Sequence, residues 1–123
     1  MLLIRQETDS DLDAVYTLIQ TAFATSEHSD GTEQDLVVAL RSSDAFIPEL
    51  ALVAVADAKI VGYIMFTKAS AGGQTLLVLA PLAVLPDYQQ HGIGSALIRE
   101  GHRIAKELGY GYISVLGSDT YYP

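Results

Sequence analysis

Two glycines that follow a long apolar stretch are the residues of this chain best suited to chemistry. Gly92 and Gly94 lie between an apolar run that ends near Leu85 and a segment with helical spacing. Because glycine has no side chain, a ligand can approach the backbone N–H groups there, and a helix N-terminus favours negative charge. The pattern predicts a cradle for a diphosphate, although a plain strand-to-helix turn would need the same residue types.

The segments on both sides of the glycines predict a strand, a helix and a second strand. Thr75 to Leu85 suits a central strand that is buried on both faces, and Pro81 must interrupt or bulge its hydrogen-bond ladder. Gly109 is expected to stop the helix, and Tyr110 to Leu116 to form the second strand. The buried side of the helix is expected to carry Ile93, Leu97, Ile104 and Leu108. This order predicts a right-handed parallel crossover.

The first half of the chain predicts a strand, two helices and a hairpin. The strand is Leu2 to Gln6, and Thr8 is expected to cap the first helix with Asp9 and Asp11 in its first turn. The buried stripe of the first helix is expected to be Leu12, Val15, Ile19, Ala22 and Phe23. The second helix is expected to bury Leu36, Val37 and Leu40 and to end near Arg41. The hairpin strands are Leu50 to Ala56 and Ile60 to Thr67, joined by Asp57-Ala58-Lys59 and followed by a turn at Gly72-Gly73.

Length and composition narrow the class of protein. A chain of 123 residues predicts one domain, residues 1–123, and these elements give it an α/β fold with a mixed, mostly antiparallel sheet flanked by helices. The absence of cysteine excludes disulfides and thiolate metal sites, and three scattered histidines predict no metal. The net charge of −8 argues against nucleic acid and favours an amine-bearing partner. No membrane segment or secretion signal is indicated, so a cytoplasmic location is expected.

Two other phosphate-binding motifs are excluded by spacing. A dinucleotide-binding fold needs Gly-x-Gly-x-x-Gly after the first strand of a parallel sheet, whereas these glycines follow about the fourth strand. A Walker phosphate loop needs Gly-Lys-Ser/Thr, which does not occur.

The motif Gln89-x-x-Gly92-x-Gly94, after the strand that ends Pro81-Leu82-Ala83-Val84-Leu85-Pro86, resembles the acetyl-CoA motif of the GNAT superfamily of N-acetyltransferases. The order of a strand, two helices and a three-strand meander before the motif is also similar to this family. The run from Leu82 to Ile98 and the later Val115-Leu116-Gly117 with Tyr121-Tyr122 look most like the bacterial YhbS-type acetyltransferases. The resemblance implies acetyl-CoA as cosubstrate and an amine of a small molecule or peptide as acceptor.

The resemblance implies binding roles for two stretches. Backbone amides of Gln90, His91, Gly92, Ile93, Gly94 and Ser95 would hold the CoA pyrophosphate, with Gln89 supporting the turn. The main chain of Leu82, Ala83 and Val84 would pair with the pantetheine arm like an added strand, and an N–H near Leu82 would stabilise the oxyanion. The side chains of Leu82 and Val84 are expected in the core whether or not their main chain binds the pantetheine arm. His91 also suits an exposed loop position.

The resemblance also implies two proton-transfer roles. Glu33, on the second helix, is the leading general base for the attacking amine, acting directly or through water, with His28 in reserve. Tyr121, or else Tyr122, would protonate the leaving thiolate, because a phenol with a pKa near 10 is protonated at neutral pH. Plain structural roles are open alternatives: Glu33 suits a solvated helix start, and the two tyrosines suit an apolar cover.

One departure from the family pattern leaves a second function open. Related domains continue with another helix and two strands, whereas this sequence stops at Pro123. The last strand would then present an unpaired edge, for which a homodimer is the expected cover. The alternative to an N-acetyltransferase is a catalytically weak CoA-binding or assembly module that keeps the glycine cradle.

Overall fold

The computed structural model describes residues 2–24, 31–71, 73–110 and 113–115. Its elements in chain order are β1 (Leu2–Gln6), the 3-10 turn η1 (Asp9–Asp11), α1 (Leu12–Phe23), α2 (Glu33–Arg41), β2 (Phe46–Ala56), β3 (Lys59–Ala71), β4 (Gln74–Val84), the 3-10 turn η2 (Pro86–Tyr88), α3 (Ile93–Glu107) and β5 (Ile113–Val115). Every helix and strand predicted from the sequence is present, and β1 has the predicted bounds.

The five strands form one sheet in the order β1-β2-β3-β4-β5. The first four pair antiparallel with their neighbours, and β5 pairs parallel with β4 after the crossover through α3. The prediction of a mixed, mostly antiparallel sheet is therefore confirmed.

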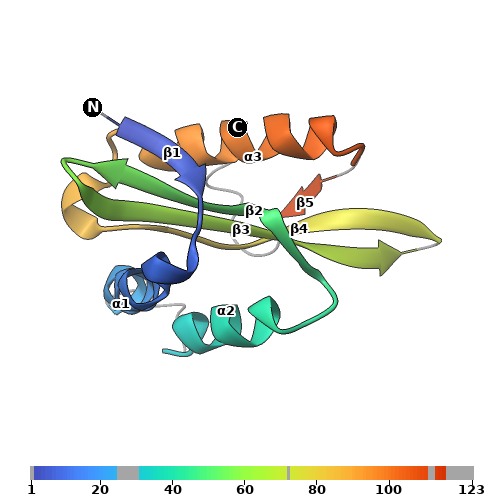
Figure 1. Cartoon of the computed structure of the whole chain (residues 1–123), viewed down its shortest axis with the longest axis horizontal. Helices are drawn as coiled ribbons and strands as arrows, with labels where there is room; N and C mark the ends of the chain where they lie inside the picture. Colours follow the sequence, from blue (N-terminus) through green and yellow to red (C-terminus); the bar gives the residue numbers. More distant parts are fainter. Residues whose placement is uncertain (1, 25–30, 72, 111–112, 116–123) are drawn as a thin grey trace.

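The helices cover the two faces of the sheet (Figure 1). On one face α3 packs over β2, β3 and β4, and on the other face α1 packs on β3 and β4 with α2 beside it. Each face has its own apolar cluster. The α3 cluster includes Leu52, Ile64, Phe66, Leu77, Leu82, Val84, Ile93 and Leu97; the α1/α2 cluster includes Val15, Leu18, Ile19, Val37, Val53, Tyr63, Met65 and Ala83.

Two glycines let α3 lie close to the sheet. A Cβ at Gly101 would come within 2.3 Å of the Phe66 ring, and a Cβ at Gly62 would come within 3.0 Å of Ile93. The helix buries Gly101 and Ala105, whereas Leu108 is 43% exposed. The prediction that Leu108 lies on the buried side is wrong, because small residues rather than large ones face the sheet toward the end of this helix.

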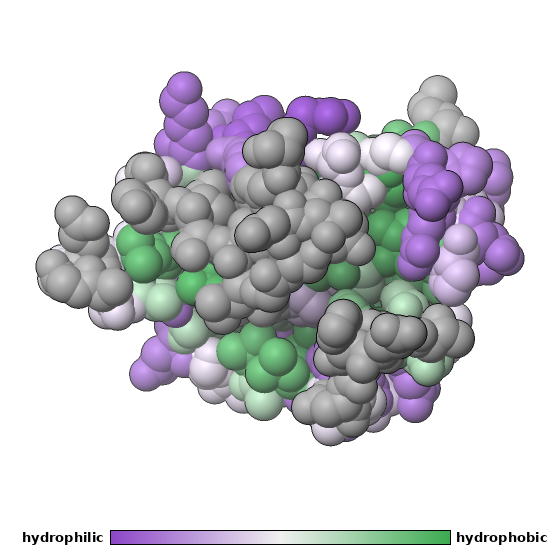
Figure 2. All heavy atoms as spheres, turned by 180° about the vertical axis from the view of Figure 1, so that it is seen from behind, coloured by the Kyte–Doolittle hydropathy of each residue, from purple (hydrophilic) through white to green (hydrophobic). Residues whose placement is uncertain are grey.

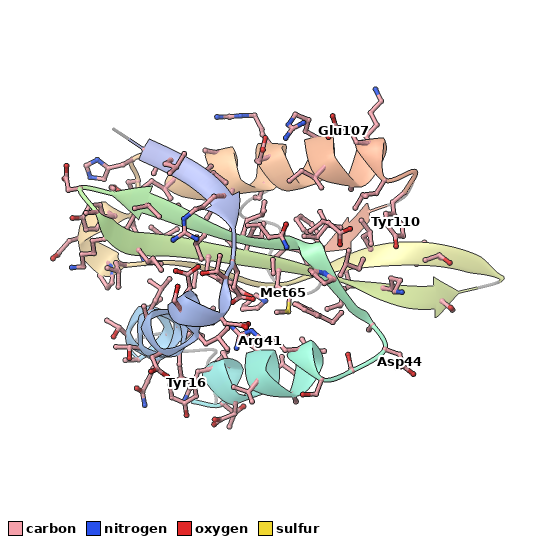
Figure 3. The ribbon with its side chains drawn as sticks, viewed as in Figure 1. Tyr16, Arg41, Asp44, Met65, Glu107 and Tyr110 are labelled. Atoms are coloured by element: carbon pink, nitrogen blue, oxygen red, sulfur yellow. The ribbon has the colours of Figure 1, made fainter. Side chains whose placement is uncertain are left out.

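The second helix buries a different face from the predicted one. Val37 is 1% exposed and Gln34 is also buried, with its side-chain amide donating to the Gly31 carbonyl at 2.9 Å. Leu36 is 47% exposed, so its predicted place on the buried face is wrong. Arg41, the last residue of α2, lies between this helix and the sheet (Figure 3), and its guanidinium pairs with Glu7.

The β2–β3 hairpin is longer than predicted and turns through two residues. Asp57 and Ala58 both have positive φ, +53° and +64°, as tight hairpin turns require. Strand β2 begins before the predicted Leu50 and includes Pro48. This proline is tolerated because β1 pairs with β2 only as far as Leu52 and the ladder to β3 is irregular between Phe46 and Ala51.

The predicted capping arrangement at Thr8 is present at the start of η1, which leads into α1. The Asp11 carboxylate accepts the Thr8 backbone N–H at 2.8 Å and two bonds from the Arg5 guanidinium at 2.7 and 3.0 Å. The hydrogen bonds from Arg5 hold the pKa of Asp11 well below its ordinary value. The carboxylate thereby joins the end of β1 to the first helix.

Candidate active site

The end of β4 is tied to the turn that follows it. The side-chain amide of Gln89 donates to the main-chain carbonyl of Val84 at 3.0 Å, and the Tyr88 N–H donates to the Leu85 carbonyl at 2.8 Å. The Gln89 N–H also donates to the Pro86 carbonyl at 3.3 Å, so the turn is held from within by one side-chain bond and two backbone bonds. This fixes where α3 begins relative to the strand.

The turn presents backbone donors at the start of α3. Gly92 is the N-cap with φ +80°, and Gln90 also has a positive φ, +65°. The Ala96 N–H donates to the Gly92 carbonyl at 3.0 Å, so the amides of the helix residues before Ala96 have no intrahelical acceptor. These are the amides of Ile93, Gly94 and Ser95, three of the predicted pyrophosphate ligands.

The space in front of Gly92 is open. A Cβ built on this residue would meet no atom within 4 Å, so the glycine is not required for packing against a neighbour. Its positive φ still disfavours any side chain. A helix N-terminus of this kind attracts anions through its free N–H groups and its dipole. The geometry therefore fits a diphosphate.

The strand before the turn is interrupted at the predicted proline. Strand β3 pairs Ile64 with Leu82 and Phe66 with Leu79, so β4 carries an extra residue at Ala80-Pro81. Within the described part of the chain, β5 pairs with β4 only at Leu77–Leu79, before this bulge. The main chain beyond the bulge is thus left without a described strand partner on its β5 side.

The side chains beyond the bulge are buried. Leu82 and Val84 belong to the α3 cluster and Ala83 to the α1/α2 cluster. Each is at most 9% exposed. Only the main-chain groups of these three residues are therefore available to a ligand, as an added strand would require.

The predicted acid–base residues are not brought to this turn by the described structure. Glu33 is the first residue of α2, half-buried, on the face of the sheet opposite α3. Tyr121, Tyr122 and the reserve candidate His28 lie outside the described residues. Gln90 and His91 are exposed on the turn itself.

A cation that the sequence did not predict, the Lys59 ammonium, lies beside the turn. The Lys59 ammonium lies 6.0 Å from the centre of the Tyr88 ring, within the range of a cation–π contact. Lys59 begins β3 and Tyr88 ends η2, so only the pairing of β3 with β4 brings them together. A positive charge near a phosphate-binding turn is favourable, and nothing in the local sequence indicates it.

The sequence reasoning also missed a buried polar cluster on the α1/α2 face. Arg41 contacts Glu7 through two bonds, Nη2 to Oε1 at 2.5 Å and Nε to Oε2 at 3.2 Å. The fully buried Tyr63 lies close enough for both charges to act on it. Burial, with the Glu7 charge, raises the pKa of the Tyr63 phenol well above its ordinary value, so the phenol is uncharged.

Neither a metal-binding cluster nor a membrane-spanning helix is found among the described residues. No three histidine or acidic side chains among residues 2–24, 31–71, 73–110 and 113–115 are grouped so that they could hold a metal ion. None of the helices in those same stretches is long and apolar enough to cross a membrane.

Known proteins resemble this chain in sequence and in structure. Residues 12–121 match the acetyltransferase (GNAT) family. YjhQ of Escherichia coli K12, named as an uncharacterized N-acetyltransferase, is 42% identical over 95 residues, 74% of this chain and 52% of YjhQ. The chain therefore spans about half the length of that relative. YhbS of the same strain, with a similar name, is 34% identical over 124 residues, 98% of this chain and 70% of YhbS.

The fold is shared with solved acetyltransferase structures. A GNAT family acetyltransferase from Brucella melitensis, in complex with acetyl-CoA, has a TM-score of 0.91 and 34% identity, covering 99% of this chain and 79% of that one. The YhbS structure from Escherichia coli, in complex with CoA, has a TM-score of 0.86. The predicted resemblance to YhbS-type proteins is confirmed. A family match over most of the residues, on a strand, turn and helix of the predicted geometry, shows that this chain belongs to the GNAT acetyltransferase family.

Proposed function

We propose that this chain is an N-acetyltransferase that uses acetyl-CoA to acetylate a primary amine of a small molecule or a peptide. The observation that carries the proposal is the open, positive-φ Gly92 turn, where α3 presents free amides next to the interrupted end of β4. Relatives with acetyl-CoA or CoA bound in their structures support the same cosubstrate here.

The binding roles are proposed from the family resemblance, and the geometry of the turn and of β4 is compatible with them. The amides from Gln90 to Ser95 hold the pyrophosphate, and Gln89 keeps the turn in place through its bond to Val84. The main chain of β4 beyond the bulge binds the pantetheine arm. The cosubstrate supplies a thioester-activated acetyl group, and an N–H near Leu82 faces the oxygen on which negative charge develops.

The proton-transfer roles are assigned to residues away from the turn. Glu33 takes the proton of the acceptor ammonium, directly or through water, so that the amine can attack. Tyr121 donates a proton to the departing thiolate, with Tyr122 as the alternative donor. These assignments predict that Glu33→Gln and Tyr121→Phe lower kcat while the affinity for acetyl-CoA stays unchanged.

The acceptor is proposed to be cationic because acidic residues are concentrated in one part of the chain. Arg41 is the one Lys or Arg between Glu7 and Glu49, a stretch that holds most of the 15 acidic residues. The described helices of this stretch, α1 and α2, form the layer on the face of the sheet opposite α3. Its field raises the local concentration of ammonium groups and lowers that of anions.

The experiment is an acetyl-transfer assay with panels of mono-amines, polyamines and lysine peptides. The readout is the free thiol of CoA that each transfer releases. Transfer that saturates in both substrates supports the proposal. Binding of acetyl-CoA without transfer to any amine would instead make the chain a CoA-binding module. A homodimer through the outer edge of β5 and a cytoplasmic location stay predictions, the first tested by sedimentation of the same sample.

A further inference from the structure

A pocket lies where β1 ends and β2 begins, on the α1/α2 face of the sheet, whereas the acetyl-CoA turn leads into α3 on the other face. Its volume is about 390 Å³, within the range that holds small organic ligands. The lining combines apolar and polar groups. The apolar residues are Leu12, Phe46 and Pro48, and the polar residues are Gln6, Glu7, Thr8, Asp9 and Arg41.

An ion pair between Glu7, the residue after β1, and Arg41, the last residue of α2, forms a charged part of this pocket. The side chains of Arg41 and Glu7 are only 15% and 6% exposed. Their contact uses two of the five N–H donors of the guanidinium and leaves lone pairs on both carboxylate oxygens. Arg41 can therefore donate a further hydrogen bond to a ligand, and Glu7 can accept one.

The polar cluster behind the pocket is incompletely hydrogen-bonded. The Tyr63 hydroxyl is buried beside Glu7 and Arg41, close enough for both to act on its pKa, but it makes no hydrogen bond of ordinary geometry to a described residue. A buried hydroxyl of this kind normally has a partner, from protein, water or ligand. This polar cluster therefore has hydrogen-bonding capacity left for a ligand or for water.

We propose that this pocket binds a free α-amino acid with an apolar side chain. The ammonium group of the ligand pairs with Glu7 and its carboxylate with Arg41, which are already side by side. The apolar side chain packs on Phe46, Leu12 and Pro48. The match is to a zwitterion because a lone cation or a lone anion would add net charge to the mostly buried Glu7–Arg41 pair, and uncompensated buried charge is costly. The Asp9 carboxylate also lines the pocket, but it is exposed to solvent.

This site is independent of the proposed acetyl transfer. The pocket is lined on the α1/α2 face of the sheet, by Leu12 and Arg41 among others, whereas the acetyl-CoA turn leads into α3 on the opposite face. The amino acid is therefore expected to bind equally well with and without saturating acetyl-CoA. Binding is read out directly, without any acetyl transfer.

The test is calorimetric titration of the whole chain with L-phenylalanine and with two probes that each lack one charge. Phenethylamine has no carboxylate, and N-acetyl-L-phenylalanine has no ammonium group. We expect L-phenylalanine to bind at one site and each probe to bind at least about tenfold more weakly. Equal affinity for either probe, or no heat of binding with a folded sample, overturns the proposal.

Two variants at neighbouring positions of β2 locate the binding. Pro48→Trp places a large ring in the pocket, whereas Glu49→Trp places the same ring at the exposed next position, outside the pocket lining. The first is expected to lose binding of L-phenylalanine and the second to keep it within about twofold. Unchanged binding in Pro48→Trp would contradict a site here.

A double variant tests the charges without leaving one of them unpaired. Glu7→Gln together with Arg41→Gln removes both charges and keeps hydrogen-bonding groups, whereas either change alone risks unfolding. The folded double variant is expected to lose the preference for the zwitterion over phenethylamine. A preference that persists would overturn the assigned contacts.

Discussion

The side chain of Gln89 donates a hydrogen bond to the main-chain carbonyl of Val84 at 3.0 Å. This single contact joins the last residue of β4 to the turn that begins α3. The same turn carries Gly92 and the free amides of the helix N-terminus. The strand end that would bind the pantetheine arm and the turn that would bind the pyrophosphate are therefore held in one fixed arrangement.

Replacement of Gln89 by alanine is expected to weaken acetyl-CoA binding about tenfold, because the turn loses this internal support. The affinity is measured by calorimetry, and the free energy of unfolding is measured on the same samples. Gln20→Ala, at an exposed position of α1, is the control and should leave the affinity unchanged. Equal affinities of the two variants for acetyl-CoA would show that Gln89 does not support the binding site.

Gly101→Ala is expected to destabilise the chain by about 1–3 kcal/mol, because its Cβ would overlap the Phe66 ring. The added atom would lie 2.3 Å from Phe66. Chemical denaturation of the single variants and of Gly101→Ala with Phe66→Leu measures the coupling. The double variant should be more stable than the sum of the two single losses predicts. Simple additivity would show that the helix relaxes away from the ring.

Val37 and Val38 offer a matched pair of substitutions on α2. Val37 is 1% exposed and Val38 is 49% exposed. Val37→Ala is expected to cost about 2 kcal/mol of unfolding free energy because it removes buried methyl groups, whereas Val38→Ala should cost less than about 0.5 kcal/mol. Thermal or urea denaturation distinguishes the two. Similar losses would mean that the assigned buried face of α2 is wrong.

The pair of Arg5 and Asp11 predicts a pH dependence of stability. The folded-state pKa of Asp11 lies below its unfolded value, so the ionised carboxylate stabilises the fold above pH about 4. This contribution is lost as the pH falls toward the folded-state pKa. Asp11→Asn should therefore be less stable than the native chain at pH about 7, by about 1–2 kcal/mol.

The difference between Asp11→Asn and the native chain should shrink as the pH falls from about 5 to about 2. Glu49→Gln, at an exposed position of β2 away from the helix N-termini, is the control and should have the same stability as the native chain across this pH range. A constant difference for Asp11→Asn across this range would show that the carboxylate charge does not contribute.

Local sequence signals predicted the elements of the candidate site well. The proline at position 81 indicated the bulge of β4, and Gly92 indicated the turn, because each has a backbone property that other residues lack. The bounds of β1 and the end of α2 near Arg41 were also predicted. These features depend on neighbouring residues in the chain.

Features set by tertiary packing were not predictable in the same way. Leu36 and Leu108 have apolar side chains at helical spacing, yet each is exposed, because the partner surface decides which side of a helix is buried. The pairs Glu7–Arg41 and Lys59–Tyr88 join residues far apart in the sequence. These contacts form only once the strands have paired, so no local sequence pattern predicts them.

The most direct test of the central claim is calorimetric titration with acetyl-CoA of the native chain, Gly92→Asp and Gly73→Asp. Both glycines have nearly the same positive φ, +80° and +81°, and neither has an atom within 4 Å of an added Cβ. The two variants therefore carry similar backbone strain, but only Gly92→Asp places a carboxylate against the proposed pyrophosphate site. We predict that the native chain and Gly73→Asp bind acetyl-CoA and that Gly92→Asp does not. Undiminished binding by Gly92→Asp, or no binding by the folded native chain, would contradict the account.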